Sequence, residues 1–174
     1  MRRSRAAGWV AAGGLMLALG AGGCATPTST DVPERMGRGP RAEEMFYARV
    51  YATSAREPNF DERRQHIDRM DDRVFKYLRE HPEIENKIYY SEFRFWRQVA
   101  EGNTPDEVRT LIDEPLEQTI DPARMGVLAK QEWADVQKKA KEAWVYPLGW
   151  ILYFDDKGVV AMLRRPQSGF LVSE

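Results

Sequence analysis

The residue best suited to chemistry in this sequence is Cys24, the only cysteine of the chain. A thiolate is a strong nucleophile, and the small residues 21–23 directly before it suit a peptidase that accepts only small side chains at its cleavage site. The two histidines, His66 and His81, have no second metal ligand at a useful spacing. No serine or threonine stands in a motif that would pair it with a base. We therefore predict no catalytic residue, no metal site and no cofactor, but a covalent modification at Cys24.

The start of the chain has the order of a secretory signal. Arg2, Arg3 and Arg5 give it a positive charge, and residues 6–19 are uncharged and mostly apolar. This apolar stretch is rich in glycine and falls short of the roughly 20 residues that a permanent membrane helix needs. We therefore predict that residues 1–23 are a signal peptide that is removed.

The sequence Ala-Gly-Gly-Cys at residues 21–24 resembles the lipobox of bacterial lipoprotein precursors. The resemblance implies that Cys24 receives a diacylglyceryl group, that the signal is cut before it, and that the new amino terminus is acylated, typically with palmitate. The expected partner is then a membrane, held through the lipid anchor. An alternative stays open, because Gly23 and Ala25 also fit an ordinary signal-peptidase site, which would leave a secreted protein without lipid. The lone cysteine favours lipidation, since a secreted chain rarely carries one unpaired thiol.

Charge and composition limit the partners of the mature chain. The signal contains three arginines and no acidic residue, which leaves 23 basic and 27 acidic side chains. Because nucleic-acid binding depends on cationic neutralisation of phosphates, no nucleic-acid partner is expected. Residues 24–42 are polar and interrupted by proline and glycine, so we predict a lipidated amino terminus followed by a flexible tether.

Residues 43–102 have the periodicity of helices. We predict one helix over 43–55 and a second over 61–80, in which Ile67, Met70, Val74 and Leu78 recur at helical spacing. Pro82 starts a third predicted helix that runs to Gly102, so that the last two form a helical hairpin.

Five aromatic residues crowd the predicted third helix between positions 89 and 96. They surround the helix instead of lining one stripe, so other parts of the chain or a partner must cover some of them. We favour a central, buried helix. The alternative is an exposed partner surface formed by Tyr89, Tyr90, Phe93 and Phe95.

Residues 103–166 combine helix and strand signals. Thr104 and Glu107 form a predicted capping box for a short helix that begins at Pro105. A brief strand over 116–120, a helix over 122–143 and a β-hairpin with its turn at 155–158 follow. We expect Gly158 to have positive φ and Pro147 to interrupt the strand ladder. Residues 167–174 are a tail.

The order of these motifs resembles the SmpA/OmlA type of small lipoprotein domain. The motifs are the glycine at 102, the capped helix, Trp144-Val-Tyr146 and the hairpin 153–160. Asp113 stands where the family has the glycine of a Gly-x-Pro sequence, and aspartate tolerates the left-handed conformation better than most residues. The resemblance implies an α+β fold in which helices pack on a small antiparallel β-sheet. It also implies an outer-membrane lipoprotein that faces the periplasm.

These observations favour a function without catalysis. The leading hypothesis is a cell-envelope lipoprotein that serves as a scaffold or adaptor in outer-membrane assembly or integrity, with an envelope protein as its partner. The alternative is an extracytoplasmic binding or inhibitor module for a periplasmic protein or ligand.

Overall fold

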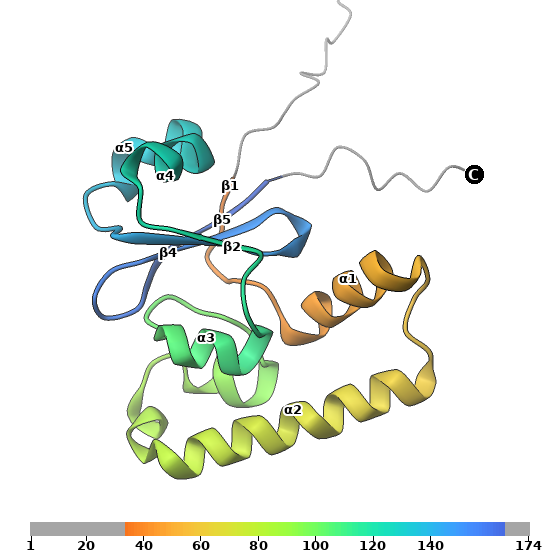
Figure 1. Cartoon of the computed structure of the whole chain (residues 1–174). Helices are drawn as coiled ribbons and strands as arrows, with labels where there is room; N and C mark the ends of the chain where they lie inside the picture. The colour runs from red at the N-terminus through yellow and green to blue at the C-terminus, as the bar shows by residue number, and fades with distance from the viewer. Residues whose placement is uncertain (1–33, 166–174) are drawn as a thin grey trace, which may run out of the picture.

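The first helices of the chain pack on one face of an antiparallel sheet, and the later helices pack on the other face (Figure 1). The computed structural model describes residues 34–165, which form an α+β fold, so the predicted fold class is confirmed. The elements follow the chain in this order: β1 (Glu34–Arg35), α1 (Ala42–Ser54), α2 (Phe60–Glu80), η1 (Pro82–Asn86), η2 (Glu92–Trp96), α3 (Pro105–Ile112), β2 (Glu117–Thr119), α4 (Pro122–Ala129), η3 (Lys130–Glu132), α5 (Trp133–Val136), β3 (Glu142–Val145), η4 (Pro147–Gly149), β4 (Trp150–Phe154) and β5 (Val159–Arg164).

The sheet has the strand order β1-β5-β4-β3-β2, and all neighbours are antiparallel. β4 lies in the middle and is buried along its whole length. Its residues alternate between two cores: Leu152 and Phe154 pack toward α1, α2 and α3, whereas Ile151 and Tyr153 pack toward α4 and α5. The predicted hairpin is confirmed as β4 and β5. Pro147 does interrupt the ladder, because it starts the short turn η4 between β3 and β4.

The two helices predicted first are confirmed, and α2 packs with the expected stripe except at its start. Met70, Val74 and Leu78 are buried, but Ile67 remains 48% exposed. Met45 and Met70 share one core with Leu111 and Trp144. Residues from both predicted regions, 43–102 and 103–166, therefore contribute to one core.

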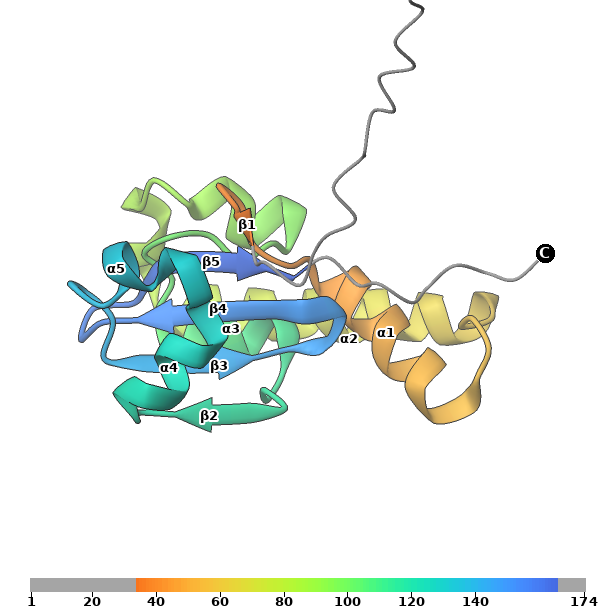
Figure 2. The same cartoon turned by 90° about the horizontal axis from the view of Figure 1, so that it is seen from above.

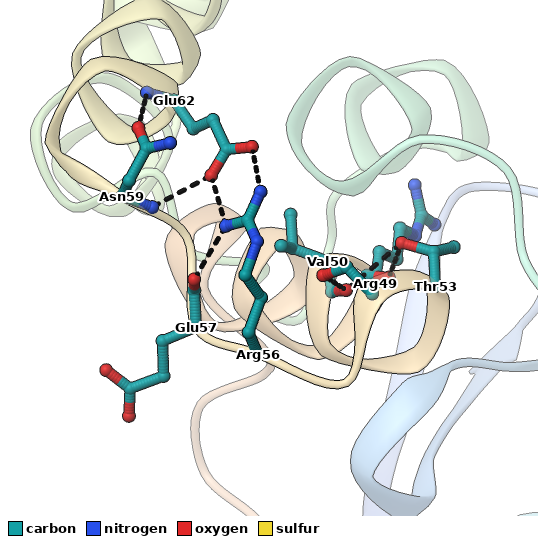
Figure 3. A network of polar contacts seen from close by, with 8 residues as sticks. Arg49, Val50, Thr53, Arg56, Glu57, Asn59 and Glu62 are labelled. Carbon is teal, nitrogen blue, oxygen red and sulfur yellow. Dashed lines mark hydrogen bonds and ion pairs between the residues drawn. The ribbon is translucent and has the colours of Figure 1, made fainter.

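A capping box fixes the connection between α1 and α2 (Figure 3). The Glu62 amide donates to Asn59 Oδ1 at 2.9 Å, and the Asn59 amide donates to Glu62 Oε2 at 2.8 Å. Arg56 also donates to the two carboxylate oxygens of Glu62, at 2.8 and 2.7 Å. These contacts fix the direction in which α2 leaves the turn.

The capping carboxylate gives a testable pH dependence. Hydrogen bonds from Arg56, and then from the Asn59 amide, lower the pKa of Glu62 from 4.5 to about 2. Because the folded chain favours the carboxylate, the stabilisation that this contact gives is fully present above a pH of 4.5, the pKa in the unfolded chain. It is lost as the pH falls through about 2, the pKa in the folded chain. We expect an NMR titration of the Glu62 carboxyl carbon to have its midpoint near 2, and Arg56→Gln to raise it. A wild-type midpoint near 4.5 would contradict this contact.

The predicted helix from Pro82 to Gly102 is wrong. The chain forms the short 3₁₀ helix η1, then the π-helical turn η2, and reverses at Arg97, which has a φ of 45°. Beyond Arg97 the backbone pairs with a distant segment: the Gly39 amide donates to the Val99 carbonyl at 2.9 Å, and the Val99 amide donates to the Pro40 carbonyl at 3.0 Å. Because these backbone groups are already satisfied, a helix has no advantage there.

The same pairing corrects the predicted tether of residues 24–42. From Glu34 onward this segment belongs to the fold, since β1 pairs with β5 and Ala42 begins α1. Gly39 also lies against the core, where an added Cβ would stand 2.7 Å from the sulfur of Met162. Only residues 24–33 of the predicted tether lie outside the described part of the chain, together with the predicted signal and the tail.

The predicted helix over 122–143 is also too long. Asp121 caps α4 by accepting from the amides of Ala123 and Arg124, but the helix ends at Ala129. Lys130 takes a φ of 50°, and the chain turns back so that Trp133 packs against Gly126, where an added Cβ would meet the indole at 3.3 Å. Within residues 34–165, no helix has the length and apolar character needed to cross a membrane.

Candidate functional site

The structure leaves only one of the four residues of the predicted aromatic surface exposed. Phe93 is fully buried, Tyr89 is 9% exposed and Tyr90 is half-buried against the same core. Only Phe95 remains open, at 60% exposure. Phe93 and Phe95 are two residues apart and therefore point to opposite sides of η2, Phe93 into the core and Phe95 to solvent. The predicted surface of Tyr89, Tyr90, Phe93 and Phe95 is therefore wrong as a unit, and Cys24 lies outside the described residues.

Tyr89 stabilises the start of α3 through a hydrogen bond to Glu107. Its hydroxyl donates to Oε1 of the buried Glu107 at 3.2 Å, while Asn103 Nδ2 and the Thr104 amide donate to Oε2 at 2.9 and 3.0 Å. Burial, together with the charge of Glu107, raises the pKa of Tyr89, so the phenol keeps its proton. The capping box predicted at Thr104 is confirmed, and its carboxylate is satisfied by donors from two segments.

Phe95 belongs to a groove between the start of α1 and the outer face of α2. One depression of about 290 Å³ is lined by Arg41, Glu43, Ile67, Phe95 and Trp96, among others. A second, of about 490 Å³, is lined by Glu43, Phe60, Arg63, Arg64 and Ile67. Because both share Glu43 and Ile67, they form one continuous surface, which we call the α1–α2 groove.

Large apolar side chains are exposed to solvent along this groove. Phe60 is 68% exposed, Trp96 is 58% exposed, and both lie beside arginines. The guanidinium of Arg41 lies 5.8 Å from the ring centroid of Trp96, and that of Arg94 lies 5.2 Å from the ring centroid of Phe95. Such cation–π contacts hold the aromatic rings without removing them from solvent. The α1–α2 groove therefore presents both apolar area and positive charge.

The cations at the α2 end of the groove are available to a ligand. Arg63 donates only a long 3.5 Å bond to the Tyr47 hydroxyl, and neither Arg63 nor Arg64 forms an ion pair with a carboxylate within residues 34–165. By contrast, Arg97 deeper in the groove is paired with Asp71. The outer part of the groove can therefore bind carboxylates, in addition to burying apolar side chains.

A second cluster lies where α3 ends, around Asp113. This residue has a φ of 61° and a ψ of −165°, a conformation that favours glycine, so the sequence prediction of a left-handed residue here is confirmed in the sign of φ. Arg49 donates to Asp113 Oδ2 at 3.0 Å, and Arg73 pairs with Oδ1. The Tyr146 hydroxyl donates to the Asp113 carbonyl at 3.0 Å. Two guanidinium groups and a tyrosine thus hold a strained turn in place.

A depression of about 440 Å³ opens between this turn and α2. It is lined by Phe46, His66, Arg69, Asp72, Arg73 and Asp113. The His66 ring stacks on Phe46 with a centroid distance of 4.1 Å, and burial, followed by the charges of Arg73 and Arg69, lowers its pKa. His66 is therefore neutral at pH 7. His81 ends α2, with Nδ1 3.2 Å from Glu83 Oε1.

The α1–α2 groove and the depression beside Asp113 differ in the side chains that they offer to a ligand. Within the described residues, no group of three or more histidine, cysteine or acidic side chains could hold a metal ion. The carboxylate of Asp113 is already neutralised by two arginines. The α1–α2 groove has the features of a docking surface, namely exposed aromatic side chains and arginine.

Sequence reasoning missed Phe60, Ile67 and Arg41 as parts of this surface. Phe60 and Ile67 are seven residues apart and so lie on one face of α2, with Arg63 and Arg64 between them. That spacing was a usable signal, but Ile67 also fitted the buried stripe. Arg41 carried no signal of its own, because its position depends on the pairing of residues 39 and 40 with Val99.

Comparison of the chain with protein-family models, curated proteins and solved structures found no match.

Proposed function

We propose that this chain is a lipid-anchored, non-enzymatic adaptor of the cell envelope that holds an envelope protein in the α1–α2 groove. The observation that carries the proposal is the exposure of Phe60, Phe95 and Trp96 beside arginines on one continuous surface. Aromatic and arginine side chains contribute most of the binding energy in typical protein interfaces. Scattered single apolar residues need no explanation, but a contiguous set of this kind does.

The support for the anchor and the compartment comes from the sequence. The charged and then apolar start, the small residues before Cys24 and the lone thiol all favour lipidation. The order of motifs from Gly102 to the hairpin favours a role in outer-membrane assembly or integrity, on the periplasmic side. The α+β fold with helices on a small antiparallel sheet agrees with that resemblance.

Replacing Cys24 tests the anchor. We expect Cys24→Ser to move the chain from the membrane fraction to the soluble fraction of the cells, because the acyl chains provide the only membrane attachment that we propose. The intact mass of the purified wild-type chain should exceed that of residues 24–174 by the mass of the acyl groups. A wild-type mass without acyl groups, or unchanged membrane association of the variant, would contradict the anchor.

A matched set of variants tests the groove. We expect a tagged wild-type chain to capture an envelope protein from detergent-solubilised membranes, and the double variant Phe60→Ser, Trp96→Ala to lose at least about tenfold of that capture, since a hot-spot residue is worth about 2 kcal/mol or more. Val127→Ala is the control, because Val127 is also exposed, at 59%, but lies on α4 across the sheet (Figure 1). Equal capture by all three chains would contradict the role of the groove.

The identity of the captured protein separates the two functional hypotheses. Capture of the machinery that inserts β-barrels into the outer membrane, sensitive to the groove variant, supports the adaptor. Capture of a soluble periplasmic protein alone, equally sensitive to the variant, supports an inhibitor or binding module instead. Both readings place the partner in the same groove.

A further inference from the structure

The sheet has an open edge at β2. β2 is the last strand in the order β1-β5-β4-β3-β2, and Figure 2 shows no element beyond it. An open edge presents unpaired backbone N–H and C=O groups, and natural proteins usually protect such edges with lysine, proline or a bulge. The three residues of β2, Glu117–Thr119, contain neither lysine nor proline. The carboxylate of Glu117 is paired with Arg124, which donates to its two oxygens at 2.7 Å each, so this charge does not protect the edge.

Exposed apolar side chains flank this edge on both sides. Leu116, directly before the strand, is 69% exposed, and Ile120, directly after it, is 76% exposed. Leu116 and Ile120 lie directly outside the two ends of β2. Within β2, successive side chains alternate between the two faces, and Gln118 lies on the face of its register partner Trp144, which packs into the core with α3. The edge therefore offers backbone hydrogen bonds and two apolar contacts together.

An apolar residue stands two positions from Gln118 on each side, Leu116 before it and Ile120 after it. If a second strand of the same sequence pairs antiparallel with Gln118 opposite Gln118, each Leu116 faces the Ile120 of the other copy. Each Glu117 then faces a Thr119, so no like charges oppose one another. Such self-complementarity is what a two-fold symmetric contact requires, whereas binding of an unrelated strand does not require it.

We infer that two copies of this chain pair through their β2 edges, antiparallel and centred on Gln118, to form one sheet that continues through both copies. The contact is short, so its affinity in solution is low. The β2 edge and the α1–α2 groove involve different residues, so the paired chains can each hold a partner.

A single cysteine at the symmetry centre tests this inference. Residues directly opposite each other in an antiparallel pair have Cα atoms about 4.5–5.5 Å apart, which is within the range for a disulfide bond. In the full exported chain with Cys24→Ser, Gln118→Cys carries the only thiol. We expect mild oxidation in intact cells to convert it to a disulfide-linked homodimer. The readout depends on neither lipid nor a groove partner, so it is separate from the tests of the proposed function.

Two further cysteine positions serve as controls. Thr119→Cys lies beside the symmetry centre and faces Glu117 of the other copy. Lys138→Cys replaces an exposed residue outside β2. We expect each to give about tenfold less homodimer than Gln118→Cys, because their thiols do not meet in the proposed register. Adding Ile120→Lys to Gln118→Cys should reduce the homodimer to the level of these controls while the thermal midpoint stays unchanged, since Ile120 is exposed.

Equal crosslinking at all three positions would overturn the inference, because it would reflect random collision. No crosslinking at Gln118→Cys in cells would also overturn it. A crosslinked product whose mass equals this chain plus a different protein would assign the β2 edge to another partner's strand and overturn self-pairing.

Discussion

Replacing Phe93 with alanine is expected to lower the free energy of unfolding by about 3–5 kcal/mol. Phe93 has no exposed surface and packs against Tyr77, with a ring-centroid distance of 5.7 Å. The ring fills the core between η2 and α2, so its removal loses transfer free energy and leaves a cavity. Urea denaturation monitored by circular dichroism measures the change, and an unchanged slope shows that only stability has changed.

Phe95 provides the matched control two residues further along the same turn. Because it is 60% exposed, Phe95→Ala should change the free energy of unfolding by no more than about 0.5–1 kcal/mol. Its effect should appear instead in capture of the envelope partner, since Phe95 lines the α1–α2 groove. Equal losses of stability in the two variants would mean that η2 does not separate its aromatic residues as described.

The aromatic segment also shows where sequence reasoning reached its limit. Tyr89 to Trp96 could be recognised as too crowded for one helical stripe, and the conclusion that something must cover part of it is confirmed by Tyr89 and Phe93. The way in which the chain separates them was not predictable. Which side of η2 faces the core depends on pairing of Val99 with residues 39 and 40, a contact that no local pattern encodes.

Elements specified by neighbouring residues were predicted well. The capping box of Thr104 and Glu107, the start of η1 at Pro82 and the turn before Gly158 each depend on side chains within a few positions. The helix predicted over 122–143 failed at Lys130, where packing of Trp133 on Gly126 outweighs the helical periodicity that continues beyond it. Local chemistry therefore specified where elements begin, whereas long-range packing decided where several of them end.

The candidate site depends even more on distant contacts. Asp113 could be recognised as a residue that tolerates positive φ, but its ion pairs with Arg49 and Arg73 join α1, α2 and the end of α3. The α1–α2 groove likewise combines Arg41 and Phe95, which lie far apart in the sequence. Neither arrangement follows from spacing along the chain, because each forms only when the helices pack on the sheet.

Gly158 lies in a turn that neighbouring residues specify, but it also contacts a loop that is distant in the sequence, residues 102–103. The Gly102 amide donates to the Val159 carbonyl at 2.8 Å, and the Val159 amide donates to the Asn103 carbonyl at 2.9 Å. These bonds tie the hairpin to the loop that caps α3. An added Cβ at Gly158 would stand 2.6 Å from the Asn103 carbonyl oxygen and 2.7 Å from that of Gly102, too close for either to remain in place. The φ of Gly158 is 155°, which side chains rarely adopt.

Gly158→Ala is therefore expected to lower the free energy of unfolding by roughly 2–4 kcal/mol, through backbone strain together with displacement of the 102–103 loop. Gly37→Ala is the control, because no atom lies within 4 Å of its added Cβ, and we expect a change below about 1 kcal/mol there. Urea midpoints measure both changes, and amide exchange at Val159 should accelerate only in the Gly158 variant, since its bond to Asn103 is broken. Similar stability of the two variants would mean that the hairpin and the α3 cap are not in contact.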